Sequence, residues 1–181
     1  EALIEIIGSG VCHTDLGFAS GAVRPKHPLP LVLGHECVGT VLETGATGSG
    51  LVGKTVIVPA VLPCGECPLC RMERGNACPN QKMPGNDIDG GFATHALVPA
   101  RHLQVLENTG DVDLRHFSVV ADAVSTAFQA THRAALSVGD LAIIVGAGGV
   151  GGFAIQIAAA LGARVIALDV NQARLELMAR H

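Results

Sequence analysis

Two hydrophobic periods divide the chain. From Glu1 to about Val105, short β-branched runs are separated by Gly- and Pro-rich turns, which predicts strands at residues 3–7, 37–43, 55–61 and 95–100. From about Phe117 onward, helical and strand patterns alternate. They predict helices and strands in the order helix 118–136, strand 141–148, helix 149–163, strand 164–170 and helix 171–180. This order is that of a βαβ unit with a parallel sheet.

The change of period predicts an α/β protein with two domains. Residues 1–121 are expected to form a β-rich domain, and residues 122–181 the first part of a doubly wound parallel sheet. The chain begins inside a strand pattern without Met or a leader, and it stops inside an amphipathic helical pattern. We therefore interpret it as a fragment of a longer protein.

Composition limits the function classes. Of 181 residues, 49% are hydrophobic and 3% aromatic, which suits a packed α/β core. The net charge is −4 and the basic residues are scattered, so we expect no nucleic-acid partner. No apolar run is long enough to span a bilayer and no signal-peptide pattern is present, so we expect no membrane association. We expect small-molecule partners and a reducing, cytoplasmic location.

The run CGECPLCRMERGNAC carries four closely spaced cysteines, Cys64, Cys67, Cys70 and Cys78. Thiolates at this C-x-x-C-x-x-C-x7-C spacing can surround one tetrahedral cation, which predicts a structural zinc site. The alternative is a pair of disulfides, but nothing else in the sequence indicates a secreted protein.

The run IIVGAGGVGGFAIQIA contains a glycine-rich motif, G-x-G-x-x-G, between a predicted strand and a predicted helix. In that context the glycines allow a tight turn, close approach of a pyrophosphate, and helix–strand packing, and the helix N-terminus offers free N–H groups. Asp169 ends the next strand, where a carboxylate would bind the adenosine ribose and repel a 2′-phosphate. We therefore predict NAD rather than NADP, with Arg174 as the residue that could favour NADP. The predicted cofactor-binding residues in this domain are Gly146, Gly148, Gly149, Val150, Gly151, Asp169 and Arg174. A glycine turn that merely packs is the alternative.

A second nucleotide motif is interpreted as a false match. GSGLVGKT, residues 48–55, fits the P-loop pattern but runs into the β-branched segment VIVPAV. A P-loop requires a helix after its Lys-Thr to hold phosphate. We expect no ATP or GTP site there.

A second set of metal-ligand types lies near the N-terminus. GVCHTD supplies Cys12, and GHE supplies His35 with Glu36, each at a Gly-marked bend. A thiolate and an imidazole, with a third protein ligand and an open position, would make a catalytic zinc site. Taken singly, Cys12 could be a buried core thiol and His35 a satisfied core histidine.

Together, GVCHTD, GHE, the four-cysteine run and VGAGGVG resemble the zinc-dependent medium-chain alcohol dehydrogenases, and the resemblance covers essentially the whole chain. It implies a GroES-like catalytic domain, a Rossmann domain, two zinc ions per chain (one catalytic and one structural), and NAD. The catalytic zinc would lie in the cleft between the domains. It also implies a homo-oligomer when the protein is full length.

The resemblance assigns roles to residues of this chain. Cys12 and His35 become ligands of the catalytic zinc, with Glu36 a carboxylate that can approach it. Thr14 takes the substrate proton, Asp15 orients His35, and His13 faces the cofactor pyrophosphate. The four cysteines become the structural zinc lobe.

The chain departs from many members of that group at two positions. Asp122 stands where a third cysteine ligand is common, and a carboxylate is an acceptable zinc ligand. The alternatives are that Asp122 is only a helix-start acid and that Glu36 is the third ligand. Gly17 stands where a histidine often passes the proton to solvent, so the proton path must end differently.

Longer stretches, including VCHTDLGFASGAV and PGNDIDGGFATHALVPARH, resemble the narrower group of 6-hydroxycyclohex-1-ene-1-carbonyl-CoA dehydrogenases of anaerobic aromatic degradation. This resemblance implies oxidation of a secondary alcohol on an acyl-CoA thioester, with hydride transfer to NAD. The alternatives are an NAD-dependent zinc dehydrogenase for a simpler alcohol or polyol, and a zinc and dinucleotide-binding module without turnover.

Overall fold

The computed structural model describes residues 1–46 and 48–180. The chain forms two compact units, Glu1–Ala121 and Asp122–His181. The division falls where the hydrophobic period of the sequence changes. The β-rich first unit and the parallel start of a Rossmann-like second unit confirm the predicted fold class.

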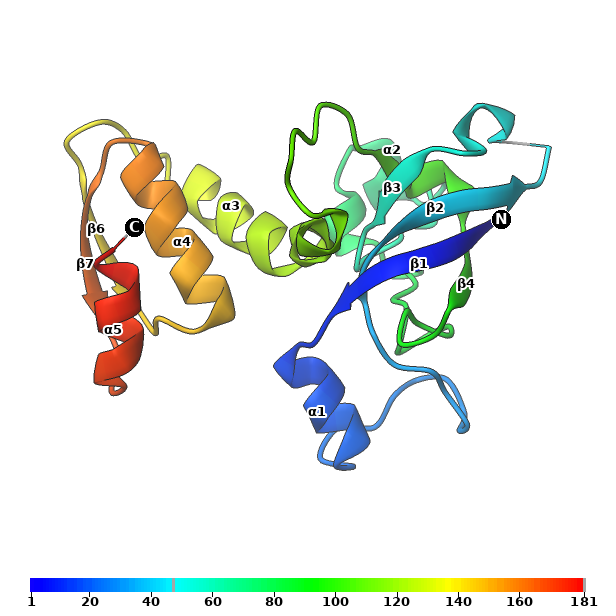
Figure 1. Ribbon diagram of the computed structural model, residues 1–181, viewed down its shortest axis with the longest axis horizontal. Coiled ribbons are helices and arrows are strands. Elements are labelled where there is room, and N and C mark those ends of the chain that lie inside the picture. The colour runs from blue at the N-terminus through cyan, green and yellow to red at the C-terminus, as the bar shows by residue number, and fades with distance from the viewer. Residues whose placement is uncertain (47, 181) are drawn as a thin grey trace. The chain divides into compact units, whose positions relative to one another are not determined.

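The first unit is built on a five-stranded antiparallel sheet of order β4-β1-β2-β3-β5 (Figure 1). Its buried face gathers mainly small and β-branched side chains, among them Ile4, Val41, Val56, Val58 and Val98. The four strands predicted from alternation are all present, and β5 is an added short edge strand. The strand bounds are Ala2–Gly10 (β1), Glu36–Thr44 (β2), Thr55–Val58 (β3), His95–Val98 (β4) and Gln104–Val105 (β5).

Short helices connect these strands. The helix α1 directly follows β1 at its lower end in Figure 1. The sequence predicted only a bend here, because the segment is short and its N-cap is a cysteine. Asp15, at the third position of the helix, completes a capping box, in which the Cys12 N–H donates to Asp15 Oδ2 at 2.9 Å. The bounds are His13–Ala19 (α1), Pro68–Arg71 (α2), and, for single 3₁₀ segments, Ser49–Leu51 (η1), Gly75–Ala77 (η2), Ala100–His102 (η3) and Leu114–Ala121 (η4).

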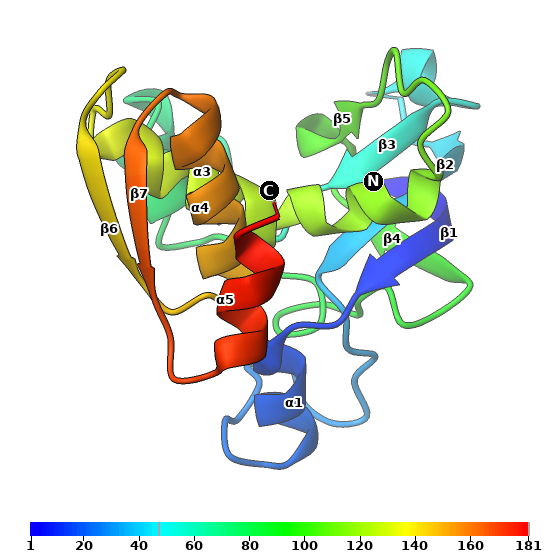
Figure 2. The same ribbon diagram turned by 60° about the vertical axis from the view of Figure 1, so that its left-hand side comes forward.

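The second unit pairs β6 with β7 in parallel, with Ile143 opposite Ile166. The helix α4 contacts both strands and also contacts α3 and α5, and Figures 1 and 2 show α4 and α5 on the same side of the two strands. The bounds are Ala123–Arg133 (α3), Leu141–Val145 (β6), Gly149–Ala160 (α4), Arg164–Leu168 (β7) and Gln172–Met178 (α5). None of the helices within residues 1–46 and 48–180 is long and apolar enough to cross a membrane.

The helix predicted at residues 118–136 is in fact two elements, so that prediction was wrong in its continuity. The 3₁₀ segment η4 ends at Ala121 and α3 begins at Ala123. Between them Asp122 has φ −138° and ψ −67°, outside the α region, and its carbonyl accepts the Thr126 N–H at 2.7 Å. Asp122 Oδ1 also accepts the Thr126 hydroxyl at 2.7 Å. The break places Asp122 at the N-cap position of α3.

Candidate functional site

The four cysteines of the loop at residues 64–78 come together in space. One sulfur from each lies within 4.8 Å of the others, and individual Sγ–Sγ distances are 3.9 Å for Cys64–Cys70, 3.8 Å for Cys67–Cys78 and 3.5 Å for Cys64–Cys78. A tetrahedral zinc with Zn–S bonds of about 2.3 Å requires sulfur separations of about 3.8 Å. All six cysteines are free in the structure, so the alternative of two disulfides among the four loop cysteines is not observed. The set fits zinc.

Backbone N–H groups favour thiolate in this loop. Hydrogen bonds from the Glu66 and Cys67 backbone lower the pKa of Cys64 to about 6. Removal from water, followed by the effect of the neighbouring thiols, raises the pKa of Cys70 to about 12. Without a metal, the four thiols would therefore ionise one after another over a wide pH range. A bound divalent cation would stabilise all four as thiolates.

The second group of ligand types among the described residues is Cys12, His35, Glu36 and Asp122, and one ligand atom from each lies within 4.8 Å of the others. Cys12 precedes α1, while His35 and Glu36 stand at the start of β2. The sequence had named these four as candidates. A soft thiolate, an imidazole and carboxylates form a donor set that suits zinc.

Asp15 organises the part of this group that lies in the first unit. Its Oδ1 accepts hydrogen bonds from His35 Nδ1 at 3.2 Å and from the Gly34 N–H at 3.1 Å, and its Oδ2 accepts from the Cys12 N–H. Asp15 is 2% exposed and His35 is fully buried. Since the carboxylate accepts from Nδ1, that nitrogen carries the proton and Nε2 is the nitrogen that can bind a metal. One carboxylate thus fixes the tautomer of His35 and the position of Cys12.

Three further predicted residues lie on or beside this arrangement. Thr14 is half-buried, with its hydroxyl 3.7 Å from Cys12 Sγ, while His13 is exposed at the first position of α1. Glu36 is 3% exposed, and a side chain at Gly10, its partner across the β1–β2 pair, would collide with its carboxylate. Gly10 is a residue that sequence reasoning missed, because its role depends on strand register.

Gly17, which stands where many members of the resembled family have a histidine, is covered by the segment that follows α1. The Val23 N–H donates to the Gly17 carbonyl at 3.1 Å, and a Cβ at Gly17 would lie 3.2 Å from Val23 Cγ2. The absence of a side chain at Gly17 thus accommodates a tight turn in this structure.

The glycine-rich turn joins β6 to α4. Gly146 has φ +95°, a conformation that disfavours any side chain, and a Cβ at Gly151 would overlap the Gly146 carbonyl. Gly148 is the N-cap of α4, and a Cβ there or at Gly149 would meet no close backbone. The turn and the helix N-terminus are therefore open to an anion from outside.

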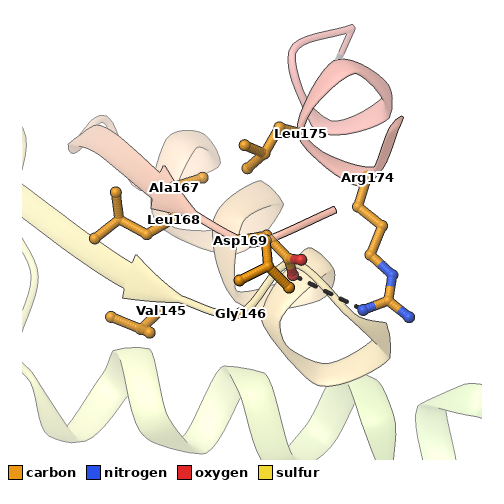
Figure 3. A pocket seen from close by; sticks show the side chains of 8 residues that line it. Val145, Gly146, Ala167, Leu168, Asp169, Arg174 and Leu175 are labelled. Carbon is orange, nitrogen blue, oxygen red and sulfur yellow. Dashed lines mark ion pairs between the residues drawn. The ribbon is translucent and has the colours of Figure 1, made fainter. Parts of the chain in front are cut away.

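A cavity of about 510 Å³ lies beside this turn, where the strands β6 and β7 end (Figure 3). Asp169 and Arg174 point toward each other there, with Arg174 Nη1 3.8 Å from Asp169 Oδ2. Hydrogen bonds from the Ala147 and Asn171 N–H groups, together with Arg174, lower the pKa of Asp169. The carboxylate is therefore ionised and holds the turn in place. This contact to Ala147 at 2.6 Å was not apparent from the sequence.

The cavity collects residues from both strands and from α5, as the predicted adenosine site requires. Val150, the remaining predicted residue, lies in the first turn of α4 and is exposed. The lining residues are Val145, Gly146, Ala167, Leu168, Asp169, Val170, Arg174 and Leu175.

The segment that matches the P-loop pattern, residues 48–55, runs into a strand, as its β-branched continuation predicted. Thr55 begins the strand β3, and only the 3₁₀ segment η1 precedes it within the match. A strand and not a helix directly follows Lys54, so the segment lacks the helix N-terminus that would hold phosphate.

Comparison with known proteins gives the same division of the chain. The family described as "Alcohol dehydrogenase GroES-like domain" matches residues 1–108, and "Alanine dehydrogenase/PNT, C-terminal domain" matches residues 121–180.

Two relatives and a solved structure illustrate the similarity. An alcohol dehydrogenase of Geobacillus stearothermophilus is 34% identical over 98% of this chain and 52% of its own length. L-galactonate-5-dehydrogenase of Escherichia coli is 34% identical over 99% of this chain and 52% of its own. The alcohol dehydrogenase structure of Aeropyrum pernix superposes with a TM-score of 0.90 at 37% identity, covering 99% of this chain and 54% of that one. The chain thus spans about half the length of the proteins it matches.

Proposed function

Because the chain belongs to the alcohol dehydrogenase GroES-like family, we propose that it is part of a zinc-dependent oxidoreductase that transfers hydride from a secondary alcohol to NAD. The observation that carries the proposal is the presence of two separate metal-ligand groups of different composition. Four thiolates fill the coordination sphere of a structural zinc. A thiolate, an imidazole and a carboxylate form the mixed ligand set of a catalytic zinc, which keeps one position open for water or substrate.

Cys12, His35 and Asp122 are proposed as the protein ligands of the catalytic zinc. Their support is the short mutual distance of the ligand atoms and the hydrogen bond from His35 Nδ1 to Asp15. Glu36 is proposed as a carboxylate that can approach the same metal. A bound zinc supplies Lewis-acid polarisation of the substrate hydroxyl, which lowers its pKa.

The remaining residues then have simple tasks. Thr14, whose hydroxyl lies beside Cys12, accepts the proton of the substrate hydroxyl and passes it on. Because residue 17 is a glycine covered by Val23, this path has no imidazole at that position and is proposed to end in water or the cofactor ribose. His13 is proposed to contact the cofactor pyrophosphate.

NAD is proposed as the hydride acceptor, bound at the glycine-rich turn and the cavity at Asp169. The support is the open N-terminus of α4 and the ionised carboxylate at the end of β7. That carboxylate repels the extra phosphate of NADP. Arg174 pairs with Asp169 at 3.8 Å, which reduces its availability for a 2′-phosphate.

For the substrate, we propose a free secondary alcohol or polyol; in support, similar proteins are named alcohol dehydrogenase and L-galactonate-5-dehydrogenase. A ring-bound secondary alcohol on an acyl-CoA thioester is a second candidate, carried by the resemblance of several sequence stretches alone. The six free cysteines agree with a reducing cytoplasm as the proposed location.

The test uses the full-length protein. We expect two zinc ions per chain and NADH formation from alcohols, measured by metal analysis and absorbance at the reduced nicotinamide band. A panel of simple secondary alcohols, polyols and cyclic hydroxyacyl-CoA thioesters separates the two substrate candidates by kcat/KM. Binding of both zinc and NAD without turnover of any alcohol in the panel would instead support a binding module.

A further inference from the structure

The four-cysteine loop is contacted by a turn from a distant part of the sequence. The segment η3 is anchored in the core of the first unit, because Ala100 and the adjoining Leu103 are both buried. Between these two anchors, His102 Nε2 donates a hydrogen bond of 2.6 Å to the carbonyl of Pro63. Pro63 directly precedes Cys64, so η3 fixes the start of the loop.

Arg101, the other residue between the anchors, lies across the loop backbone. Gly65 has φ +80°, and a Cβ placed on it would lie 2.7 Å from Nη1 and 3.5 Å from Cζ of Arg101. The guanidinium therefore rests on the backbone between Cys64 and Cys67. The absence of a side chain at Gly65 is what permits this approach.

The same stretch of backbone serves the sulfur atoms. The Cys64 N–H donates to Cys78 Sγ at 3.4 Å. The backbones of Glu66 and Cys67 lower the pKa of Cys64, and the Gly65 backbone acts in the same direction on the pKa of Cys70. A displacement of this stretch would therefore move the donors that face the metal ligands. Arg101 therefore contacts a segment whose backbone acts on the sulfur atoms of Cys64, Cys70 and Cys78.

Charge gives Arg101 a second effect. Four thiolates around one zinc ion carry a net charge of −2, which is favoured by a nearby cation. Among residues 1–46 and 48–180, Arg101 forms no ion pair with a carboxylate, so its charge is not neutralised by one. A guanidinium is also weakly hydrated and planar, which suits stacking on a peptide group.

We propose that Arg101 is a positioning residue of the four-cysteine metal centre, holding the Gly65 backbone in place and supplying positive charge to the zinc tetrathiolate. The proposal concerns the retention of structural zinc and does not depend on the dehydrogenase activity. Partners outside the ligand shell typically change metal affinity by about 10–100-fold. Because Arg101 is exposed and screened by water, the lower end of that range is expected.

The experiment measures zinc release to a chelator from the full-length protein in a Cys12→Ser background, so that the four-cysteine centre dominates the signal. Arg101→Gln keeps a planar polar group on a shorter stem and removes the charge, and we expect release about tenfold faster than in the parent at low salt. The ratio should shrink in about 1 M salt, where the screening length is about 3 Å. Arg101→Lys keeps the charge but loses the planar group, so it should release zinc more slowly than Arg101→Gln and faster than the parent. Arg24→Gln, an exposed arginine outside the loop and η3, is the matched control and should change nothing.

Two results would overturn the proposal. One is release from Arg101→Gln at the parent rate in low salt. The other is equally fast release from Arg101→Lys and Arg101→Gln with no dependence on salt, which would mean that the charge of Arg101 contributes nothing to zinc retention. Turnover is not measured in either arm, so an enzyme without dehydrogenase activity would leave the test intact.

Discussion

The four-cysteine loop and the Cys12–His35 centre are both candidate zinc sites, yet the chain encodes them in opposite ways. The loop draws all its ligands from residues 64–78, where the short helix α2 turns the chain. The other centre draws on residues 12, 35, 36 and 122. A local site depends on its own spacing, whereas an assembled site depends on every element that brings its ligands together.

The assembled centre depends on a buried polar network that the loop lacks. Asp15 alone accepts hydrogen bonds from the backbone of Cys12 and Gly34 and from the ring of His35. In the loop the sulfur atoms are held by backbone N–H groups that the turn provides itself. We therefore expect substitutions outside the ligands to disturb the assembled centre more than the loop, where Arg101 is expected to contribute only about tenfold.

The largest effect is expected from removing a loop ligand. Cys67→Ala should abolish zinc binding by the loop and lower the thermal midpoint of the full-length protein by about 10 °C or more, because structural metal binding contributes directly to folding. Cys37→Ala is the control, since Cys37 is also buried but its thiol lies outside the loop, beside Ser9 and the Gly34 carbonyl. Zinc content and thermal unfolding measure both. A Cys67→Ala protein that kept its zinc and its midpoint would refute the structural role of the loop.

The next effect concerns Asp122, the proposed third ligand of the assembled centre. Asp122→Asn should weaken metal binding there on the order of 100-fold while the loop stays loaded, because an amide oxygen is a poor ligand. Metal analysis should then find one zinc per chain instead of two, with loss of turnover. Two zinc ions and full turnover would point to Glu36 or water as the third ligand.

A residue that touches no metal should also matter in the assembled centre. Asp15→Asn removes the charge and one of the two acceptor oxygens, so the orientation of His35 or the position of Cys12 is lost. We expect metal affinity at that centre to fall by about 10–100-fold, with the loop unaffected. Asp89→Asn is the control, because Asp89 also accepts a backbone hydrogen bond, from Val32, but outside the site. Equal metal titration curves for the two variants would contradict the role of Asp15.

The same contrast explains what the sequence could predict. Spacing alone identified the four cysteines, and the strand–glycine–helix order located the dinucleotide turn, because both are local. The strands followed from alternation, and Thr55 as the start of β3 removed the P-loop match. Residue type alone suggested Cys12 and His35 as metal ligands, but Asp122 was added to them only through a family resemblance.

Other features depend on contacts between distant residues and left no sequence signal. The space that Gly10 leaves for Glu36 requires the β1–β2 register, and the contact of Arg101 with Gly65 requires the docking of η3. The break at Asp122 was missed because the apolar pattern continues through it, while its backbone leaves the α region.

The smallest effect is expected at the glycine-rich turn, an intermediate case in which a local motif is held by Asp169 from the next strand. Asp169→Asn removes the charge that repels a 2′-phosphate and weakens the hydrogen bond from the Ala147 N–H. We expect NAD to bind the full-length protein several-fold more weakly and NADP to gain relative to NAD. Both dissociation constants can be measured by fluorescence titration. An unchanged preference would mean that another residue selects the cofactor.

The charge of Asp169 also predicts a pH dependence. Its pKa is lowered in the folded protein, first by the Ala147 N–H, so the carboxylate stabilises the fold fully above its ordinary pKa of about 4 and loses this contribution as pH falls through the folded value. The difference in thermal midpoint between the wild type and Asp169→Asn should therefore be constant from about pH 5 to 7 and should shrink below about pH 4. Asp140→Asn, at a carboxylate that accepts the Ser137 N–H in the same unit, controls for a general loss of charge. A wild-type advantage that persisted unchanged at low pH would show that packing of the turn, and not the ionised carboxylate, links β7 to the glycine-rich turn.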